Sequence, residues 1–542
     1  MKRFKAISVG TMILALLLAA GCSSGSKDAG KAAQGGNTGQ TDPKVGGTLV
    51  IGTGADATGL DPELVLNNES GFVMSLLYDR LVGFKPGTSE VVPMLAEKWE
   101  ISDDGKTYTF HIRKGVKFHD GTPLTAKEVA ADYARGTDPN HKYYYKKLSG
   151  VNSFAGDTFG SVTNVETPDD FTIKFTLKEP YAPFLTNLAM VYHGVMNPKE
   201  TEKYGFDSGQ HPDGTGPFKL VEWVKNDHIT VEANKDYWQG RPYLDKVIFK
   251  IVPENNVRVL KLQSGELDVV LDVGPEDYAK LKGDSKVTLL EQPGLAANGV
   301  GLPVDTAPFD KKEVRQALNY ATDKAQLDEF LYKGLAVEMT QYVPQVDWSY
   351  DPGIKGYPYD PEKAKQLLAK AGYPNGFKTE LLTYPNPRGY NPIGGKLAVA
   401  LQEQWKKVGV EVEIKQLEWG TFLKTIRSGD YHFPHLRGWT GDNGDPDNFL
   451  ATLNHTRAIP VGNTSHYSNK QVDDLLDQAI RVSDQTKRKE LYRQADKIMV
   501  DDAPWVMINS TKQVRAISTK VKGFQLNPLQ MLFDFNTVYI QK

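Results

Sequence analysis

Short segments in which apolar and polar residues alternate recur along this chain and predict half-buried β-strands. The clearest run is 108–112 (YTFHI), and the same pattern returns at 171–177 (FTIKFTL) and 246–251 (KVIFKI). Alternation with a period of two places the apolar side chains on one face of a strand. A further apolar run at 47–52 (GTLVIG) predicts the first strand of the folded part.

Helical patterns alternate with these strands. Residues 125–128 (TAKE) form a capping-box sequence, which predicts the start of a helix that continues through Tyr133. A strand is expected at 410–414, and further helices are expected near residues 311–333, 361–372, 394–408, 469–482 and 486–501. Strands and helices mixed in this order predict an α/β fold, in which helices flank the sheets.

The first 21 residues have the pattern of an export signal. A basic start at 1–5 precedes an apolar run at 13–20, and small residues lead to Cys22, the only cysteine. The run is too short for a permanent membrane helix. A cysteine at this position resembles the lipidated residue of bacterial lipoproteins, although the usual Leu three residues earlier is replaced by Ala19. The alternative is a plain signal peptide with an incidental cysteine.

Residues 22–46 are small and polar and predict a flexible tether, because they cannot bury enough apolar surface to offset their ordering entropy. Cleavage before Cys22 would remove three basic residues and no acid, which changes the net charge from −3 to −6. A modestly acidic chain without a basic stretch is not expected to bind nucleic acid. The 22 Phe, 25 Tyr and 8 Trp indicate large cores, held without any internal disulfide.

One motif is misleading. Residues 52–57 (GTGADA) fit the dinucleotide-binding pattern after a strand. That loop must open a helix at once, so that the pyrophosphate meets the helix N-terminus. Gly59 and Pro62 follow instead, and no helical period begins. A Rossmann site is therefore not expected.

Spaced motifs from about residue 47 to the C-terminus resemble the peptide-binding members of extracellular solute-binding family 5. They occur in family order at 95–99 (LAEKW) with 126–129 (AKEV), 214–218 (GTGPF), 234–242 (NKDYWQGRP), 314–318 (VRQAL), 360–364 (DPEKA) and 438–447 (GWTGDNGDPD). The last motif discriminates best and is similar to that of the dipeptide-binding subgroup.

The resemblance implies a two-lobe clam shell of the periplasmic-binding-protein type (class II), with an extra subdomain in lobe I. Lobe I would comprise residues 47–295 and 508–542, and lobe II residues 296–507. It also implies a monomeric, non-enzymatic receptor that closes over a dipeptide or short peptide and delivers it to the transmembrane subunits of an ABC permease. The lipid on Cys22 would hold this receptor at the outer face of the cytoplasmic membrane. Receptors for longer oligopeptides, for haem or for a nickel complex, and a peptide sensor, are the alternatives.

The resemblance assigns the two termini of a peptide to two charged residues. A dipeptide is a zwitterion, and a dry cleft must neutralise both of its ends. Arg388, in 387–392 (PRGYNP), matches the guanidinium that binds the peptide carboxylate. Asp442 matches the carboxylate that binds the peptide ammonium. The family pattern has Pro where this chain has Gly389. A surface role for Arg388 and a turn-forming role for Asp442 are the alternatives.

Five weaker contacts complete the predicted site. Gly441 and Trp439 belong to the last motif, and Trp439 is either a cleft wall or core. Ser70 and Gly71 lie in the segment 67–71, which is predicted as a loop that offers backbone groups to the peptide or as a plain surface loop. Tyr467 either closes over a side chain or packs in the core.

No cofactor, metal or catalytic site is expected. His432 and His435 form an H-x-x-H pair, but Pro434 lies between them and predicts an extended chain, in which such residues point to opposite faces. The acidic run 442–447 fails the EF-hand pattern. The chain has no G-x-S-x-G, H-E-x-x-H or P-loop sequence, so no reaction class is indicated.

Overall fold

The computed structural model describes residues 45–148 and 154–541. The predicted signal sequence, the lipidation at Cys22 and nearly all of the tether lie outside these residues. Within the described ranges, no helix is long and apolar enough to cross a membrane.

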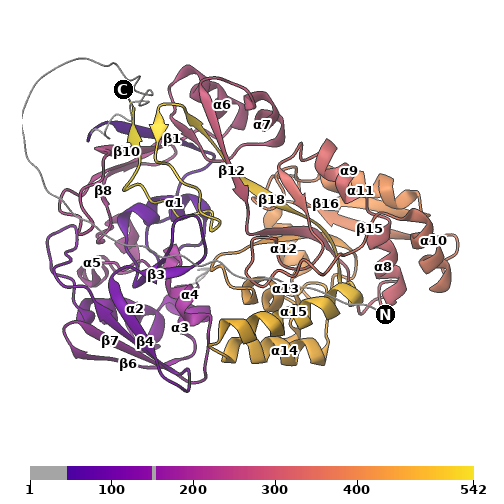
Figure 1. Ribbon diagram of the computed structural model, residues 1–542, viewed down its shortest axis with the longest axis horizontal. Coiled ribbons are helices and arrows are strands. Elements are labelled where there is room, and N and C mark those ends of the chain that lie inside the picture. Colours follow the sequence, from indigo (N-terminus) through magenta and orange to yellow (C-terminus); the bar gives the residue numbers. More distant parts are fainter. Residues whose placement is uncertain (1–44, 149–153, 542) are drawn as a thin grey trace, which may run out of the picture. The chain divides into compact units, whose positions relative to one another are not determined.

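A large mixed sheet forms the centre of the structure (Figure 1). Its strands run in the order β16-β15-β17-β13-β18-β11-β1-β10-β9-β8, and β12 and β14 also pair with β18. In chain order they are β1 (Thr48–Thr53), β8 (Phe218–Val224), β9 (His228–Ala233), β10 (Lys246–Ile251), β11 (Val269–Val270), β12 (Val287–Pro293), β13 (Ala296–Gly301), β14 (Ala336–Glu338), β15 (Phe377–Thr383), β16 (Val410–Gln416), β17 (His435–Thr440) and β18 (Trp505–Ser518).

The long strand β18 joins two groups of strands. Its first half pairs antiparallel with β13, whose strand neighbour on the other side is β17. Its second half pairs antiparallel with β12 and, at its end, with β11. Figure 1 shows β18 in yellow beside β12. Strands that precede residue 295 and strands that follow it therefore meet on one continuous strand.

Smaller sheets complete the β-structure. One has the order β4-β5-β7-β6, and two two-stranded sheets pair β2 with β3 and β19 with β20. Their bounds are β2 (Val82–Phe84), β3 (Val91–Pro93), β4 (Ala96–Ile101), β5 (Thr107–Ile112), β6 (Val162–Asp169), β7 (Thr172–Leu177), β19 (Val521–Lys522) and β20 (Tyr539–Ile540). The helix α2 packs against β6 and β7.

The helices flank these sheets. They are α1 (Asn68–Leu77), α2 (Ala126–Thr137), α3 (Ala155–Phe159), α4 (Phe184–Leu188), α5 (Pro198–Tyr204), α6 (Asn255–Ser264), α7 (Pro275–Leu281), α8 (Lys312–Tyr320), α9 (Lys324–Phe330), α10 (Pro361–Lys370), α11 (Lys396–Lys406), α12 (Trp419–Ile426), α13 (Asp447–Asn454), α14 (Lys470–Arg481) and α15 (Gln485–Asp502). Short 3-10 turns occur at Tyr145–Lys147, Val191–His193, Gly205–Gln210 and Thr456–Ala458.

Most elements predicted from periodicity are confirmed. The four predicted strands correspond to β1, β5, β7 and β10, and the strand at 410–414 corresponds to β16. The predicted capping box begins α2: the Thr125 hydroxyl accepts from the Lys127 N–H at 3.2 Å, and the Glu128 carboxylate accepts from the Thr125 N–H at 3.0 Å. No helix follows the glycine-rich segment after β1 until Asn68, as the rejection of a dinucleotide site requires.

Two predicted segments are wrong. The single helix expected at 311–333 is two helices, α8 and α9. The Asp323 carboxylate accepts from the Gln326 N–H at 3.0 Å, so it caps a new helix instead of continuing the first. The segment 67–71 is not a loop: Asn67 caps α1, and Ser70 and Gly71 lie in its first turn.

Apolar clusters pack on both groups of strands. Leu49, Val231 and Phe249 lie in one cluster, and Val300, Leu401 and Trp405 lie in another. A further cluster includes Phe110, Phe449 and Trp505, and so brings together residues from both ends of the chain. Packing of this extent explains why the fold needs no disulfide.

Candidate functional site

The segment that carries Arg388 forms a tight turn. The Arg388 and Asn391 backbones exchange two hydrogen bonds, each 2.9 Å long. Thr511 of β18 donates its hydroxyl to the Gly389 carbonyl at 2.9 Å. The Tyr390 ring covers Gly438 of β17 so closely that a Cβ there would overlap it. The turn is therefore fixed to the strand that leads to Asp442.

The Arg388 side chain lies on an aromatic ring and has no counter-ion. Its guanidinium carbon is 3.8 Å from the centre of the Trp419 ring, and its Nε is buried without a hydrogen bond. Burial lowers the pKa of Arg388 below its usual value. Among residues 45–148 and 154–541, no carboxylate forms an ion pair with it. A planar cation held in this way can bind a carboxylate with two parallel hydrogen bonds.

Asp442 is the matching unpaired acid. Its backbone N–H donates to the Asn448 side chain at 3.3 Å, whereas its carboxyl group has no hydrogen bond or ion pair with any described residue. Burial raises the pKa of Asp442 to about 7. An ammonium group bound beside it would lower that pKa, because an opposite charge favours the ionised form. No hydrogen bond or ion pair joins Arg388 and Asp442 within the described part of the chain.

A cavity of about 780 Å³ adjoins the segment that carries Asp442. It is lined from two parts of the chain, 154–190 and 427–481. Trp439 and Asn443 line it on either side of Asp442 in sequence, although neither Asp442 nor Arg388 itself is a lining residue. Trp439 donates its indole N–H to Asn448 at 2.8 Å, and it is a half-buried wall of the cavity. The volume of the cavity is in the range of small-molecule sites, roughly 300–1,000 Å³.

The sequence analysis missed two arginines of this cavity, Arg427 and Arg437. Arg437 is 3% exposed in β17 and donates to the Gly462 carbonyl at 3.3 Å, and burial lowers its pKa to about 10. Burial also lowers the pKa of Arg427, at the end of α12. An arginine inside a buried strand is a signal that could have identified Arg437. No comparable pattern marks Arg427.

Gly441 and Tyr467, two of the weaker predicted contacts, pack within the protein. The Gly441 N–H donates to the Leu295 carbonyl at 2.8 Å, and a Cβ on Gly441 would lie 2.8 Å from the Phe449 ring. Tyr467 is buried and donates its hydroxyl to Asp502 at 2.7 Å, which is the core-packing alternative. Gly441 therefore allows a close approach of backbone and ring in the segment before Asp442.

Ser70 and Gly71 use their polar groups within the protein. The buried Ser70 hydroxyl accepts from the Thr58 and Gly59 N–H groups at 3.1 and 3.4 Å. The Gly71 N–H donates to the Asn67 carbonyl at 3.0 Å. Their backbone and hydroxyl groups hold the segment before α1 in place.

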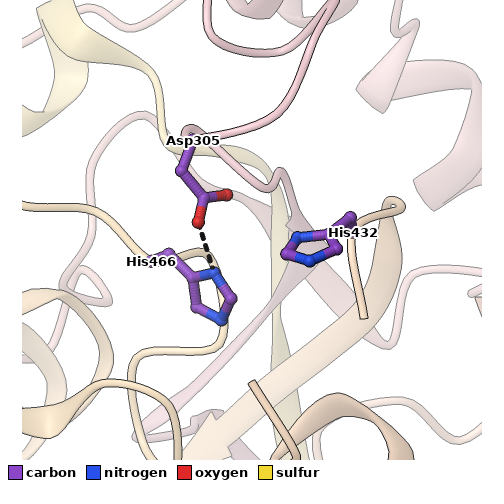
Figure 2. A group of neighbouring side chains, drawn as sticks. All are labelled: Asp305, His432 and His466. Carbon is purple, nitrogen blue, oxygen red and sulfur yellow. Dashed lines mark hydrogen bonds and ion pairs between the residues drawn. The ribbon is translucent and has the colours of Figure 1, made fainter. Parts of the chain in front are cut away.

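His432 and His435 do not act as a pair. His435 is buried and contacts the Thr464 hydroxyl at 2.7 Å, and burial lowers its pKa to about 3. His432 instead lies near His466 and Asp305 (Figure 2), where one ligand atom from each residue is within 4.8 Å of the others. His466 Nδ1 is 2.9 Å from an Asp305 oxygen. These three residues are of the types that bind zinc, although His466 and Asp305 already contact each other directly.

Comparisons with known proteins agree on one family. The model of the bacterial extracellular solute-binding proteins, family 5 Middle, matches residues 90–460. The dipeptide-binding protein of Escherichia coli (strain K12) is 39% identical over 497 residues, which cover 89% of this chain and 92% of that protein. Heme-binding protein A of Haemophilus influenzae is 38% identical over 546 residues, which cover 98% and 97%.

A solved structure has the same fold. The ABC transporter-associated periplasmic binding protein DppA from Helicobacter pylori, in complex with the peptide STSA, superimposes with a TM-score of 0.78 at 35% identity, covering 92% of this chain and 99% of that one. This likeness confirms the predicted α/β fold of the periplasmic-binding-protein type. The match of sequence over most of the length, together with the shared fold, establishes that this chain belongs to the bacterial extracellular solute-binding proteins of family 5.

Proposed function

We propose that this protein captures short peptides, above all dipeptides, by their two charged termini and delivers them to an ABC importer. The observation that carries the proposal is a pair of opposite charges, Arg388 and Asp442, that form no ion pair with any described residue. Arg388 lies in the 388–391 turn, and Asp442 follows β17, the strand on which that turn packs. Arg388 would bind the peptide carboxylate, and Asp442 would bind the ammonium. Trp439 would form a wall for the peptide side chains, and Gly441 is proposed as a weaker contact in the segment before Asp442. Ser70 and Gly71 are proposed as weaker peptide contacts, and Tyr467 as a weaker contact to a peptide side chain. The polar groups of all three form hydrogen bonds to other residues of the protein.

The receptor would work by closure of two lobes over the peptide. Lobe I (47–295 and 508–542) and lobe II (296–507) would close over the peptide about the crossing at β18. Moving such an equilibrium from 1:99 to 99:1 requires a differential affinity of about 5.5 kcal/mol. The protein would be a monomer that returns its ligand unchanged. Cleavage before Cys22 and lipidation of that residue would anchor it outside the membrane, with 22–46 as tether.

A second candidate ligand is a longer peptide. The cavity of about 780 Å³ leaves room beyond two residues, and the solved relative from Helicobacter pylori carries the peptide STSA. The two candidates differ in the length of the peptide and share the use of at least one charged terminus.

Calorimetry with capped peptides tests the proposal. Ala-Ala should bind, whereas N-acetyl-Ala-Ala and Ala-Ala-amide should lose most of the affinity, because each cap removes one terminal charge. A series from Ala-Ala to tetra-Ala then distinguishes the two candidates. Equal binding of capped and free dipeptides would contradict the assignment of Arg388 and Asp442. Mass spectrometry after incubation would reveal any hydrolysis.

A further inference from the structure

Three arginines form a cluster around Tyr390. Arg388 is two residues before it in the tight turn, and Arg437 precedes Gly438, the residue that the Tyr390 ring covers. Arg427 completes the group: the charges of all three arginines act on Tyr390, and each lowers its pKa against the effect of burial. We define Arg388, Arg427 and Arg437 as the arginine cluster.

None of the three is held by a close carboxylate of a described residue, and the one acid that acts on any of them is Glu418, which attracts Arg388 without an ion pair. The Nε of each is buried without a hydrogen-bond partner, and none of them forms an ion pair with a residue in the described ranges. Arg427 and Arg437 also repel each other, and that repulsion helps to lower the pKa of Arg437. An unpaired charge removed from water is costly, by several kcal/mol per ion. Arg437 is buried, and Arg388 and Arg427 are partly buried, so an anion bound among them would offset part of this cost.

Other arginines of the same cavity are already paired. Arg457 lies 2.6 Å from Asp477, and Arg481 lies 3.3 Å from Glu179. The missing counter-ions are therefore a property of the arginine cluster and not of the cavity as a whole.

The acids that line the cavity do not neutralise the cluster. Besides Glu179, these are Asp157 and Asp447. Burial raises the pKa of Asp447 to about 7, and the arginines that act on it are Arg457 and Arg488. Burial alone raises the pKa of Asp157. Neither carboxyl group makes an ion pair with Arg427 or Arg437.

We propose that the site prefers peptides with an acidic side chain, whose extra carboxylate binds Arg427 and Arg437. The inference rests on the proposed function, because Arg388 is then occupied by the terminal carboxylate. One terminal carboxylate satisfies one guanidinium, and two cations remain in the cavity. A Glu or Asp side chain supplies a second anion at the distance of a few bonds from the first.

Arg437 is held in place at the wall of the cavity. Its bond to the Gly462 carbonyl and its position 5.8 Å from the Trp439 ring hold the guanidinium at the cavity wall. A fixed guanidinium loses little entropy when it binds a carboxylate. Arg427 lines the same cavity from the end of α12.

Matched peptide pairs test the inference on the full chain. Calorimetry would compare Ala-Glu with Ala-Gln and Glu-Ala with Gln-Ala, which have nearly the same shape but differ by one charge. We expect the acidic peptide of at least one pair to bind about tenfold to a hundredfold more tightly, as hydrogen bonds between charged groups imply. In Arg437→Gln and in Arg427→Gln this ratio should fall towards one. In the control Arg481→Gln, which removes a paired arginine of the same cavity, the ratio should persist.

The outcomes separate this inference from the proposed function. Equal binding within both pairs by the wild-type protein overturns the acidic preference and leaves dipeptide capture intact. Absence of binding of all four peptides overturns both. A preference that survives in Arg427→Gln and Arg437→Gln contradicts the assigned residues. If one variant fails to fold, the other provides the same test, and thermal unfolding identifies such a failure.

Discussion

The guanidinium of Arg388 lies over the ring of Trp419, with its central carbon 3.8 Å from the centre of the ring. Trp419 begins α12, and its ring in turn stacks on Phe422 at 5.5 Å. The cation is therefore oriented by an aromatic pair from a helix and not by a carboxylate. Stacking occupies the face of the guanidinium, whereas its N–H groups point along its edge, in the plane that a carboxylate would share.

Loss of the stacking ring should weaken peptide binding without removing any charge. In Trp419→Leu the guanidinium would lose a cation–π contact worth about 1–2 kcal/mol when partly desolvated. Binding of the peptide should become less favourable by a similar amount. Calorimetry with Ala-Ala measures the change. Trp223→Leu is the control, because it removes a ring covered by Lys225 at 3.2 Å in a segment remote in sequence from the site.

Replacement of Arg388 itself should be more severe. Arg388→Ala would leave the bound carboxylate without a partner, which costs roughly 3–5 kcal/mol for a buried pair. Arg388→Lys should recover only part of this loss, since an ammonium neither stacks as a plane nor donates two parallel bonds. If Arg388→Ala binds Ala-Ala as the wild type does, the carboxylate lies elsewhere.

The affinity should depend on pH through Asp442. Burial holds the pKa of the empty carboxyl at about 7, and a bound ammonium lowers it. Binding below pH 7 must therefore expel a proton, so the affinity for Ala-Ala should fall as the pH is lowered from 8 to 6. In Asp442→Asn the affinity should be low and this dependence should largely vanish. A pH profile in Asp442→Asn that is as steep as in the wild type would assign the titration to another group, such as Asp447.

The same carboxyl should destabilise the ligand-free protein. Its folded pKa lies above the unfolded value, so its protonated form favours the folded state and its ionised form opposes it. The cost appears as the pH rises from about 4 through about 7 and is fully present above that. Asp442→Asn should therefore increase the free energy of unfolding at pH 8 by roughly 1–3 kcal/mol, since the group is partly exposed, and so raise the melting temperature. At pH 4 it should change the melting temperature little. A melting temperature lowered at pH 8 would contradict the unpaired state of Asp442.

A different acid–base pair should stabilise the fold. Arg135 of α2 lies 2.6 Å from Asp61, both are buried, and Asp61 also accepts from the Ser208 hydroxyl at 3.0 Å. Arg135→Ala would leave Asp61 buried without its partner and should cost roughly 3–5 kcal/mol in unfolding free energy. Lys127 lies on the same helix as Arg135, and Lys127→Ala breaks an exposed pair with Asp170 of the turn between β6 and β7, which should cost less than about 1 kcal/mol. Denaturant unfolding compares the two variants.

The sequence predicted those parts of the molecule that depend on local patterns. The capping box of α2 and the alternation of β5 follow from neighbouring residues, and motif spacing identified Arg388 and Asp442. The break between α8 and α9 was missed, because the helical spacing of apolar residues was followed across Asp323, the residue that caps the second helix. The cluster of His432 with Asp305 and His466 could not be found from H-x-x-H spacing, since its members are brought together by three separate loops.

The arginine cluster shows the same limit at the site. Arg427 ends a helix with no motif, and Arg437 stands before a motif that the family resemblance covers only from Gly438 onward. Their common environment arises because the 388–391 turn packs against β17. No pattern within either segment encodes that contact.

The contact between the turn and β17 can itself be tested. Gly438 has no side chain, and the Tyr390 ring occupies the space where a Cβ would be. Gly438→Ala should therefore displace Tyr390 and shift the turn that carries Arg388, so that peptide affinity falls although no charged group is changed. Gly389→Ala is the matched control in the same turn, because the nearest atom to its Cβ would be 3.5 Å away, at ordinary contact distance. Near-normal binding in Gly438→Ala, measured by calorimetry on a variant that melts as the wild type does, would show that the turn does not need this packing to position Arg388.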